Sequence, residues 1–206
     1  MFRALIEKFR AIIQYLRIFE HNIEAHYYRQ PFASEKSQLI LRWAALHGGR
    51  IFVETGTWYG KTISNVASSF TKCYSIELDY VLYEAARERF KEMPWVQMVH
   101  GDSALAIPRV LEEIDGPTVF WLDAHYCGLG TAVGKDKRHT PIFEELGSIF
   151  SHRVSNHLVL VDDARCFVGI GGYPTIRRLA RFIRENGHGY EMRISDDVIV
   201  IYRENY

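Results

Sequence analysis

The stretch from residue 51 to residue 60, Ile-Phe-Val-Glu-Thr-Gly-Thr-Trp-Tyr-Gly, joins an apolar run to a turn that contains two glycines. Residues 51–53 suit a buried strand, and the pattern of residues 61–70 predicts a helix directly after the turn. Gly56 and Gly60 let the backbone approach a ligand closely, and the N-terminus of the following helix can face that ligand. This stretch is typical of a strand, loop and helix that bind a nucleotide-type cofactor.

Strands alternate with helices along the rest of the chain. The pattern predicts strands at 51–55, 72–77, 95–99, 118–123, 157–162, 189–195 and 198–203, and helices at 2–19, 34–47, 60–70, 80–92, 103–113, 141–151 and 174–186. Strands joined by helices are expected to pair in parallel, whereas the last two strands, separated only by Asp196 and Asp197, are expected to pair antiparallel. The expected fold is an α/β sandwich that ends in a hairpin.

Length and composition favour one globular domain. The chain has 206 residues, of which 48% are hydrophobic, and its 25 basic residues equal its 25 acidic residues. Because there is no net charge and no run of basic residues, nucleic acid is not expected as a partner. The three cysteines lack the spacing of a zinc site or a disulfide framework, so we expect a protein of the reducing cytoplasm.

The N-terminal segment is predicted to form an amphipathic helix. Charged residues such as Glu7, Lys8 and Arg17 interrupt its apolar residues, so we expect neither a secretory signal nor a transmembrane segment. The helix either packs on its own domain, covers a substrate site or forms a homodimer. The expected organisation is an N-terminal helix and connector at 1–33, followed by the main domain at 34–206.

Carboxylates stand where the predicted parallel strands end, and in such sheets ligands bind beyond these ends. They are Glu54, Glu77, Asp102, Asp123, Asp162 and Asp163. Glu77 can accept hydrogen bonds from both hydroxyls of a ribose, which predicts an adenosine-type ligand. The glycines are spaced GxxxG rather than GxGxxG, which disfavours a pyrophosphate cofactor. Asp102 and Ser103 can meet the edge of an adenine or cap the next helix.

The order of these motifs resembles that of the class I S-adenosylmethionine-dependent methyltransferases, over roughly residues 34–203. The resemblance implies a Rossmann-like, mostly parallel seven-stranded sheet with a C-terminal antiparallel hairpin, preceded here by N-terminal helices. It also implies that the sheet edge binds S-adenosylmethionine. The implied cofactor-binding residues are Glu54, Thr55, Gly56, Thr57 and Gly60 for the methionine part, Glu77 for the ribose, Asp102 and Ser103 for the adenine, and Asp123.

The segments 120–125 and 160–163 further resemble the metal-dependent O-methyltransferases, in particular the catechol and macrolide-sugar branches. By this resemblance Asp123, Asp162 and Asp163 bind Mg²⁺, which holds two vicinal oxygens of the substrate. Oxygen ligands of this kind are those that Mg²⁺ prefers, and the ion would lower the pKa of a bound hydroxyl.

The chain also departs from the catechol branch. It has Tyr126 where that branch has a lysine base, and Asp163 where that branch has an asparagine. His125 is our candidate for the base, since imidazole titrates near neutral pH, and it joins Asp123 as a predicted catalytic residue.

The sequence therefore predicts an enzyme that O-methylates a hydroxyl of a small molecule, with a sugar favoured over a catechol. The loop at 127–140 carries Lys135, Lys137, Arg138 and His139, which either contact an anionic substrate or belong to a solvated loop. Two alternatives stay open: a metal-independent methyltransferase of the same fold, and a non-catalytic binding or scaffold protein that retains the fold. A nicotinamide oxidoreductase is disfavoured by the glycine spacing.

Overall fold

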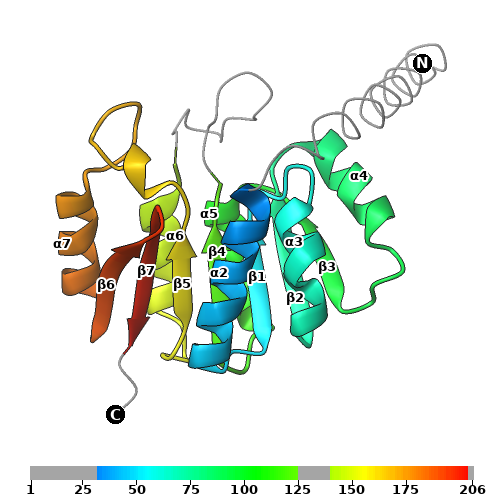
Figure 1. The fold of residues 1–206 in the computed structure, drawn as a ribbon, viewed down its shortest axis with the longest axis horizontal. Helices are drawn as coiled ribbons and strands as arrows, with labels where there is room; N and C mark the ends of the chain where they lie inside the picture. Colours follow the sequence, from blue (N-terminus) through cyan, green and yellow to red (C-terminus); the bar gives the residue numbers. More distant parts are fainter. Residues whose placement is uncertain (1–31, 125–139, 204–206) are drawn as a thin grey trace. The chain divides into compact units, whose positions relative to one another are not determined.

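The computed structural model describes residues 32–124 and 140–203, so the predicted helix at 2–19 lies outside the described residues. Seven strands form one sheet in the order β3-β2-β1-β4-β5-β7-β6 (Figure 1). Their bounds are β1 Ile51–Thr55, β2 Lys72–Glu77, β3 Val96–His100, β4 Thr118–Leu122, β5 Leu158–Val161, β6 Tyr190–Ser195 and β7 Val198–Arg203. The strands β1 to β5 pair in parallel, whereas β7 pairs antiparallel with both β5 and β6.

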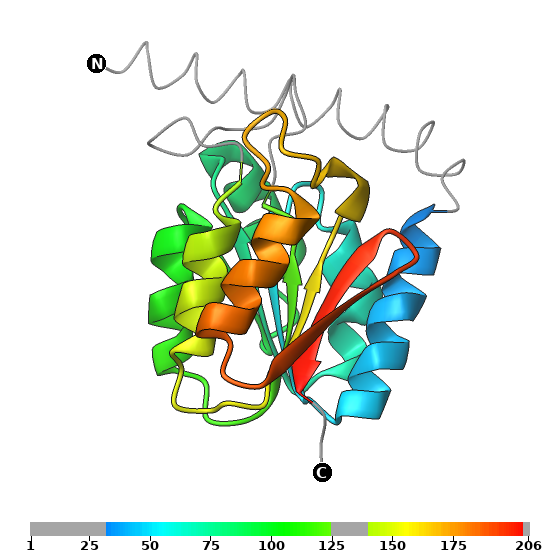
Figure 2. The same ribbon diagram turned by 90° about the vertical axis from the view of Figure 1, so that its left-hand side faces the viewer.

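Helices cover both faces of this sheet (Figures 1 and 2). The helices are α2 Phe32–His47, α3 Lys61–Val66, α4 Tyr80–Arg89, α5 Ser103–Glu112, α6 Ile142–Phe150 and α7 Ile176–Asn186, with short 3₁₀ turns η1 Ala67–Ser69 and η2 Ala164–Cys166. Within the described ranges, no helix is long and apolar enough to cross a bilayer.

The alternation of side chains along the strands divides the core into two clusters. In β4, Phe120 and Leu122 point to the cluster that contains α5, α6 and α7, whereas Val119 and Trp121 point to the cluster that contains α2 and α3. All five residues of β4 are buried, as expected for a central strand covered on both faces. The sheet is therefore the middle layer of three.

The parallel register brings the carboxyl ends of the five parallel strands to one edge of the sheet. Thr55 of β1 pairs with Ile76 on one side and Leu122 on the other, and Leu122 pairs with Val161. The predicted sheet and its terminal hairpin are thus confirmed. Of the carboxylates predicted at the strand ends, Glu77 ends β2, and Asp102, Asp123, Asp162 and Asp163 follow the ends of β3, β4 and β5, whereas Glu54 lies inside β1.

Two local features refine the expectations. The predicted helix at 60–70 is two shorter pieces: α3 ends at Val66, whose φ is −110°, and the chain continues as the 3₁₀ turn η1. Asp196 and Asp197 both adopt positive φ angles, 51° and 64°, and so form the tight turn that closes the β6–β7 hairpin. The proposed division at 1–33 and 34–206 stays a prediction.

Candidate functional site

The glycine loop between β1 and α3 is held close to the neighbouring strands. Gly56 has φ +80°, and its N–H donates to the carbonyl of Ile76 at 2.9 Å. A Cβ at this position would lie 2.5 Å from the backbone oxygen of Asp123, so only glycine fits. Gly60 has φ +65° and closes the loop by donating to Thr57 at 2.7 Å. The two glycines predicted from the sequence thus each have a conformational reason.

Glu77 is the last residue of β2, and its side chain connects the glycine loop to β2 through hydrogen bonds. The carboxylate is 6% exposed; Oε2 accepts from the backbone N–H of Trp58 at 2.7 Å and Oε1 accepts from that of Asp79 at 2.9 Å. Burial raises the pKa of this carboxyl, and the two backbone donors oppose that rise. Each oxygen keeps a second lone pair, so the carboxylate can still accept hydrogen bonds from a bound diol.

Glu54 lies under the glycine loop instead of at its surface. It is the fourth residue of β1 and 1% exposed, and its Oε2 accepts from Ser75 Oγ at 2.5 Å. Ser75 Oγ lies 2.7 Å from Thr57 Oγ1, so a chain of three buried polar groups reaches the loop. Burial raises the pKa of Glu54 to about 8, and the nearby charges of Asp123 and Glu77 add to the rise. The carboxyl is therefore mostly neutral at pH 7.

Ser75 and Trp58 are residues of this site that the sequence analysis did not select. Ser75 is a buried hydroxyl between Tyr74 and Ile76 of β2, and that position is the only signal that marks it in the sequence. Trp58 has φ +46°, which is rare for a bulky residue, and its side chain is 51% exposed and stacked on Tyr59. Nothing in the sequence except its place between two glycines indicates that conformation.

Asp102 and Ser103 follow β3 and begin α5. Asp102 is the N-cap of this helix, and its Oδ1 accepts from the N–H of Ala104 at 3.0 Å. The preceding Gly101 donates to the carbonyl of Glu77 at 2.9 Å, which places this turn directly beside the end of β2. The capping role considered from the sequence is thus present, whereas adenine contact by Asp102 and the buried Ser103 stays a prediction.

The ends of β4 and β5 bring Asp123 and Asp162 to the same edge. The N–H of Asp123 donates to Thr55, and the N–H of Asp162 donates to Leu122, each at 3.1 Å. Asp162 is buried, and its Oδ1 accepts from the N–H of Asp163 at 2.7 Å. Asp163 itself adopts a left-handed conformation with φ 54°.

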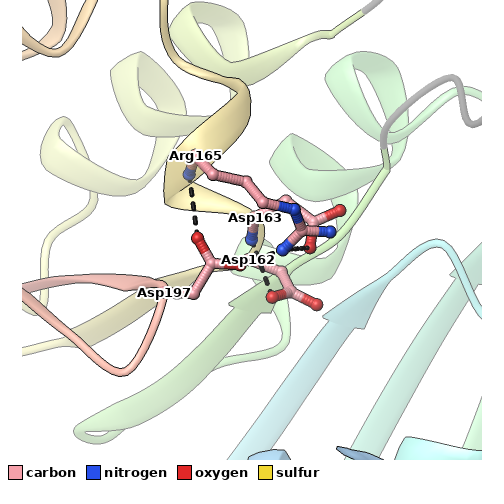
Figure 3. A network of polar contacts seen from close by, with 4 residues as sticks. All are labelled: Asp162, Asp163, Arg165 and Asp197. Carbon is pink, nitrogen blue, oxygen red and sulfur yellow. Dashed lines mark hydrogen bonds and ion pairs between the residues drawn. The ribbon is translucent and has the colours of Figure 1, made fainter.

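Arg165 binds Asp163 and joins it to the terminal hairpin (Figure 3). Its Nη1 lies 3.0 Å from Asp163 Oδ1 and also contacts Asp197 Oδ2, and its backbone N–H donates to Asp197 Oδ1 at 2.9 Å. This network fastens the end of β5 to the β6–β7 turn.

The three predicted metal ligands, Asp123, Asp162 and Asp163, directly follow β4 and β5. In the part of the chain that the structure describes, no three His, Cys, Asp or Glu side chains converge so that they could hold a metal ion. Asp163 is ion-paired with Arg165, and Asp162 already accepts a backbone hydrogen bond. Binding of Mg²⁺ by Asp123, Asp162 and Asp163 therefore stays a prediction.

Several predicted residues fall outside the described ranges. They are His125, the candidate base, and the cationic residues of the loop at 127–139. Their roles stay predictions.

Comparisons with known proteins agree on the fold. No protein-family model and no curated protein sequence matches the chain. Among solved structures, the O-methyltransferase from Bacillus cereus in complex with SAH has a TM-score of 0.58 at 13% identity, over 92% of this chain and 88% of that one. TomG, an O-methyltransferase from Streptomyces achromogenes solved with SAM, has a TM-score of 0.56 at 18% identity, over 82% of this chain and 80% of that one.

The same fold also occurs in an enzyme with a different kind of acceptor. The 23S rRNA methyltransferase ErmE matches with a TM-score of 0.51 at 16% identity, over 81% of this chain and 68% of that one. The chain therefore has the fold of the class I S-adenosylmethionine-dependent methyltransferases, as its motifs predicted. The fold by itself does not select the acceptor.

Proposed function

We propose that this protein transfers a methyl group from S-adenosylmethionine to a hydroxyl oxygen of a small molecule. The observation that carries the proposal is the buried Glu77 carboxylate, which is fixed to the glycine loop through Trp58 and stands at the carboxyl edge of the sheet. A carboxylate held in this way accepts hydrogen bonds from a ribose without reorganising.

The chain's own residues would hold the two reactants and take up one proton. When bound, S-adenosylmethionine supplies an electrophilic methyl group: the sulfur–carbon bond breaks with its electron pair on sulfur as the oxygen–carbon bond forms. Glu77 and the loop around Gly56 would orient the donor, while Asp123, whose backbone abuts Gly56, faces the same edge. Positioning of this kind supplies much of the rate when little covalent help is needed.

The proton of the acceptor hydroxyl needs a base. Our candidates are His125 and Asp123, and a sugar or a sugar-containing metabolite is the acceptor that the resemblance favours. We expect His125→Ala to abolish turnover and leave the affinity for S-adenosylhomocysteine intact. Turnover close to that of the unaltered protein would remove His125 from the mechanism.

Magnesium dependence is a separate part of the proposal. The sequence predicts a Mg²⁺ requirement, whereas the pairing of Asp163 with Arg165 favours the metal-independent alternative. We therefore expect methyl transfer to polyhydroxylated acceptors to survive EDTA. Loss of transfer in EDTA and its recovery with MgCl₂ would support the metal-dependent reaction instead. Transfer to no acceptor under either condition, together with intact cofactor binding, would favour a scaffold protein.

A further inference from the structure

Helix α7 concentrates positive charge on one side of a chain that has no net charge. Leu179 and Ile183 are buried in the core, whereas four arginines of the helix are exposed: Arg177, Arg178, Arg181 and Arg184. Within the described residues none of these four makes an ion pair, and Arg178 lies over the ring of Phe143 at 5.2 Å. The helix also carries one exposed acid, Glu185, so its exposed side chains have a net positive charge although the whole chain has none.

The loop that precedes α7 presents aliphatic side chains to solvent. Val168 is 60% exposed and Ile170 is 75% exposed, among the largest exposed fractions of the apolar residues described. Gly169 and Gly171, on either side of Ile170, adopt positive φ angles. Val168 and Ile170 therefore give this loop a small exposed aliphatic tip.

This loop is held in one conformation by its own contacts. Val168 and Thr175 form an antiparallel bridge, and the N–H of Ile176 donates to the carbonyl of Phe167 at 2.9 Å. The buried Phe167 ring meets that of Tyr173 edge to face at 5.5 Å. The ends of the loop are therefore anchored while Val168 and Ile170 face outward.

We propose that α7 and residues 168–172 form a docking surface for a membrane that contains anionic lipids. An exposed aliphatic tip can enter the boundary between head groups and acyl chains, and neighbouring basic residues are attracted to an anionic leaflet. Guanidinium groups also bind phosphate oxygens through two parallel hydrogen bonds. Charge and exposed apolar surface lie next to each other here, which is what such a surface requires.

Nucleic acid is the competing polyanion, and the side chains beside the arginines argue against it. Sites for single-stranded nucleic acid pair cations with exposed aromatic rings on which bases stack. The exposed residues next to α7 are Val168 and Ile170, which are aliphatic, and Tyr173 is partly buried against Phe167. The apolar interior of a lipid bilayer suits these aliphatic side chains better than stacked bases do.

The position of this surface has a consequence for the proposed activity. The loop at 168–172 follows β5 by way of η2, and it therefore starts at the sheet edge that carries Glu77 and the glycine loop (Figures 1 and 2). Docking through it would bring that edge near the lipid surface, so an acceptor held in the membrane would be within reach. That consequence rests on the proposed function, whereas the docking itself does not.

The test is co-sedimentation of the full chain with vesicles of phosphatidylcholine alone and of phosphatidylcholine mixed with phosphatidylglycerol. We expect binding only to the mixed vesicles, and weaker binding as salt is added. The double variant Arg181→Gln, Arg184→Gln should weaken binding by about fivefold for each arginine. Ile170→Ser should weaken it as well, without changing its dependence on salt.

A matched control removes two positive charges elsewhere. Arg87→Gln with Lys91→Gln alters two exposed residues near β3, at the opposite end of the sheet from β6. Arg87 and Lys91 form ion pairs with Glu84 and Glu88, and Arg87 also lies over the ring of Tyr83. This double variant should leave vesicle binding unchanged. S-adenosylhomocysteine binding, measured on every variant, separates a lost docking surface from a lost cofactor site. Equal vesicle binding by the α7 variant and the control would overturn the proposal. Loss of oligonucleotide binding in the α7 variant, with vesicle binding unaffected, would overturn it too.

Discussion

The hydroxyl of Ser75 lies 2.5 Å from Oε2 of Glu54, and both side chains are buried on neighbouring strands under the glycine loop. Since Ser75 donates to Glu54, Thr57 is the donor in the 2.7 Å contact with Ser75. Glu54 therefore supports the loop from below through two hydroxyls. Direct contact of Glu54 with the cofactor, which the resemblance implied, stays a prediction.

The first prediction concerns the pH dependence of stability. Because the folded-state pKa of Glu54 is raised to about 8, the folded protein keeps a proton that the unfolded chain loses near its ordinary pKa of 4.5. The contribution of Glu54 to stability is full below about pH 4.5, declines as pH rises, and is gone above about pH 8. The side chain of Glu54→Gln cannot ionise. The free energy of unfolding of the unaltered protein minus that of Glu54→Gln should therefore fall as pH rises through this window, by at most about 1.4 kcal/mol per pH unit.

Denaturant unfolding at several pH values measures that difference. Glu92→Gln, at an exposed position, is the control and should follow the unaltered protein at every pH. If the difference between Glu54→Gln and the unaltered protein stays constant from pH 5 to pH 8, Glu54 does not hold its proton in the fold.

The second prediction concerns the close approach of the glycine loop to β4. In Gly56→Ala the new Cβ would meet the backbone oxygen of Asp123 at 2.5 Å, and the φ of +80° alone costs about 1–2 kcal/mol for an L residue. We expect calorimetry to show about a tenfold or larger loss of S-adenosylhomocysteine affinity. Gly116→Ala, which meets nothing within 4 Å, should bind normally. Unchanged affinity in Gly56→Ala would mean that the loop does not approach the ligand.

The third prediction concerns the carboxylate that joins β2 to the loop. Both oxygens of Glu77 accept backbone hydrogen bonds, and Gln offers only one acceptor oxygen. A hydrogen bond to a charged group is worth about 1.5–3 kcal/mol, so Glu77→Gln should bind S-adenosylhomocysteine about tenfold or more weakly. Calorimetry beside Glu92→Gln measures this, and matching affinities for the two variants would take Glu77 out of the cofactor site.

The fourth prediction concerns a buried histidine at the opposite edge of the sheet. Nδ1 of His157 accepts from the N–H of Thr118 at 3.2 Å, and its Nε2 lies 2.9 Å from His152. Burial is the main cause that lowers the pKa of His157 to about 3. Below about pH 6.5, His157 binds a proton in the unfolded chain but stays neutral in the folded protein. The free energy of unfolding should therefore fall as pH falls toward 3.

Replacing His157 by Gln should reduce stability at pH 7 and flatten its decline in acid, as measured by denaturant unfolding. His188→Asn is the matched control, because His188 is exposed and its φ of 40° suits asparagine. A decline that is equally steep in His157→Gln and the control would assign the acid sensitivity to other groups.

The sequence predicted the strands well because their apolar runs are short and their periodicity is clear. The ends of β1, β2 and β7 are those expected, and the parallel register then carries Glu77, Asp102 and Asp123 to one edge. What could not be predicted is how side chains pair once they are there. The ion pair of Arg165 with Asp163 depends on the position of the β6–β7 turn. The position of Glu54 under the glycine loop depends on how its side chain is buried in the fold. These relationships arise from tertiary packing, which no local pattern records.

The most direct test of the central claim is calorimetry of S-adenosylhomocysteine binding to the metal-stripped full chain, repeated with added Mg²⁺. The account predicts micromolar-range binding without metal that Glu77→Gln weakens and Glu92→Gln does not. Absence of detectable binding in both conditions would contradict the methyltransferase account and leave a protein that keeps the fold without the cofactor.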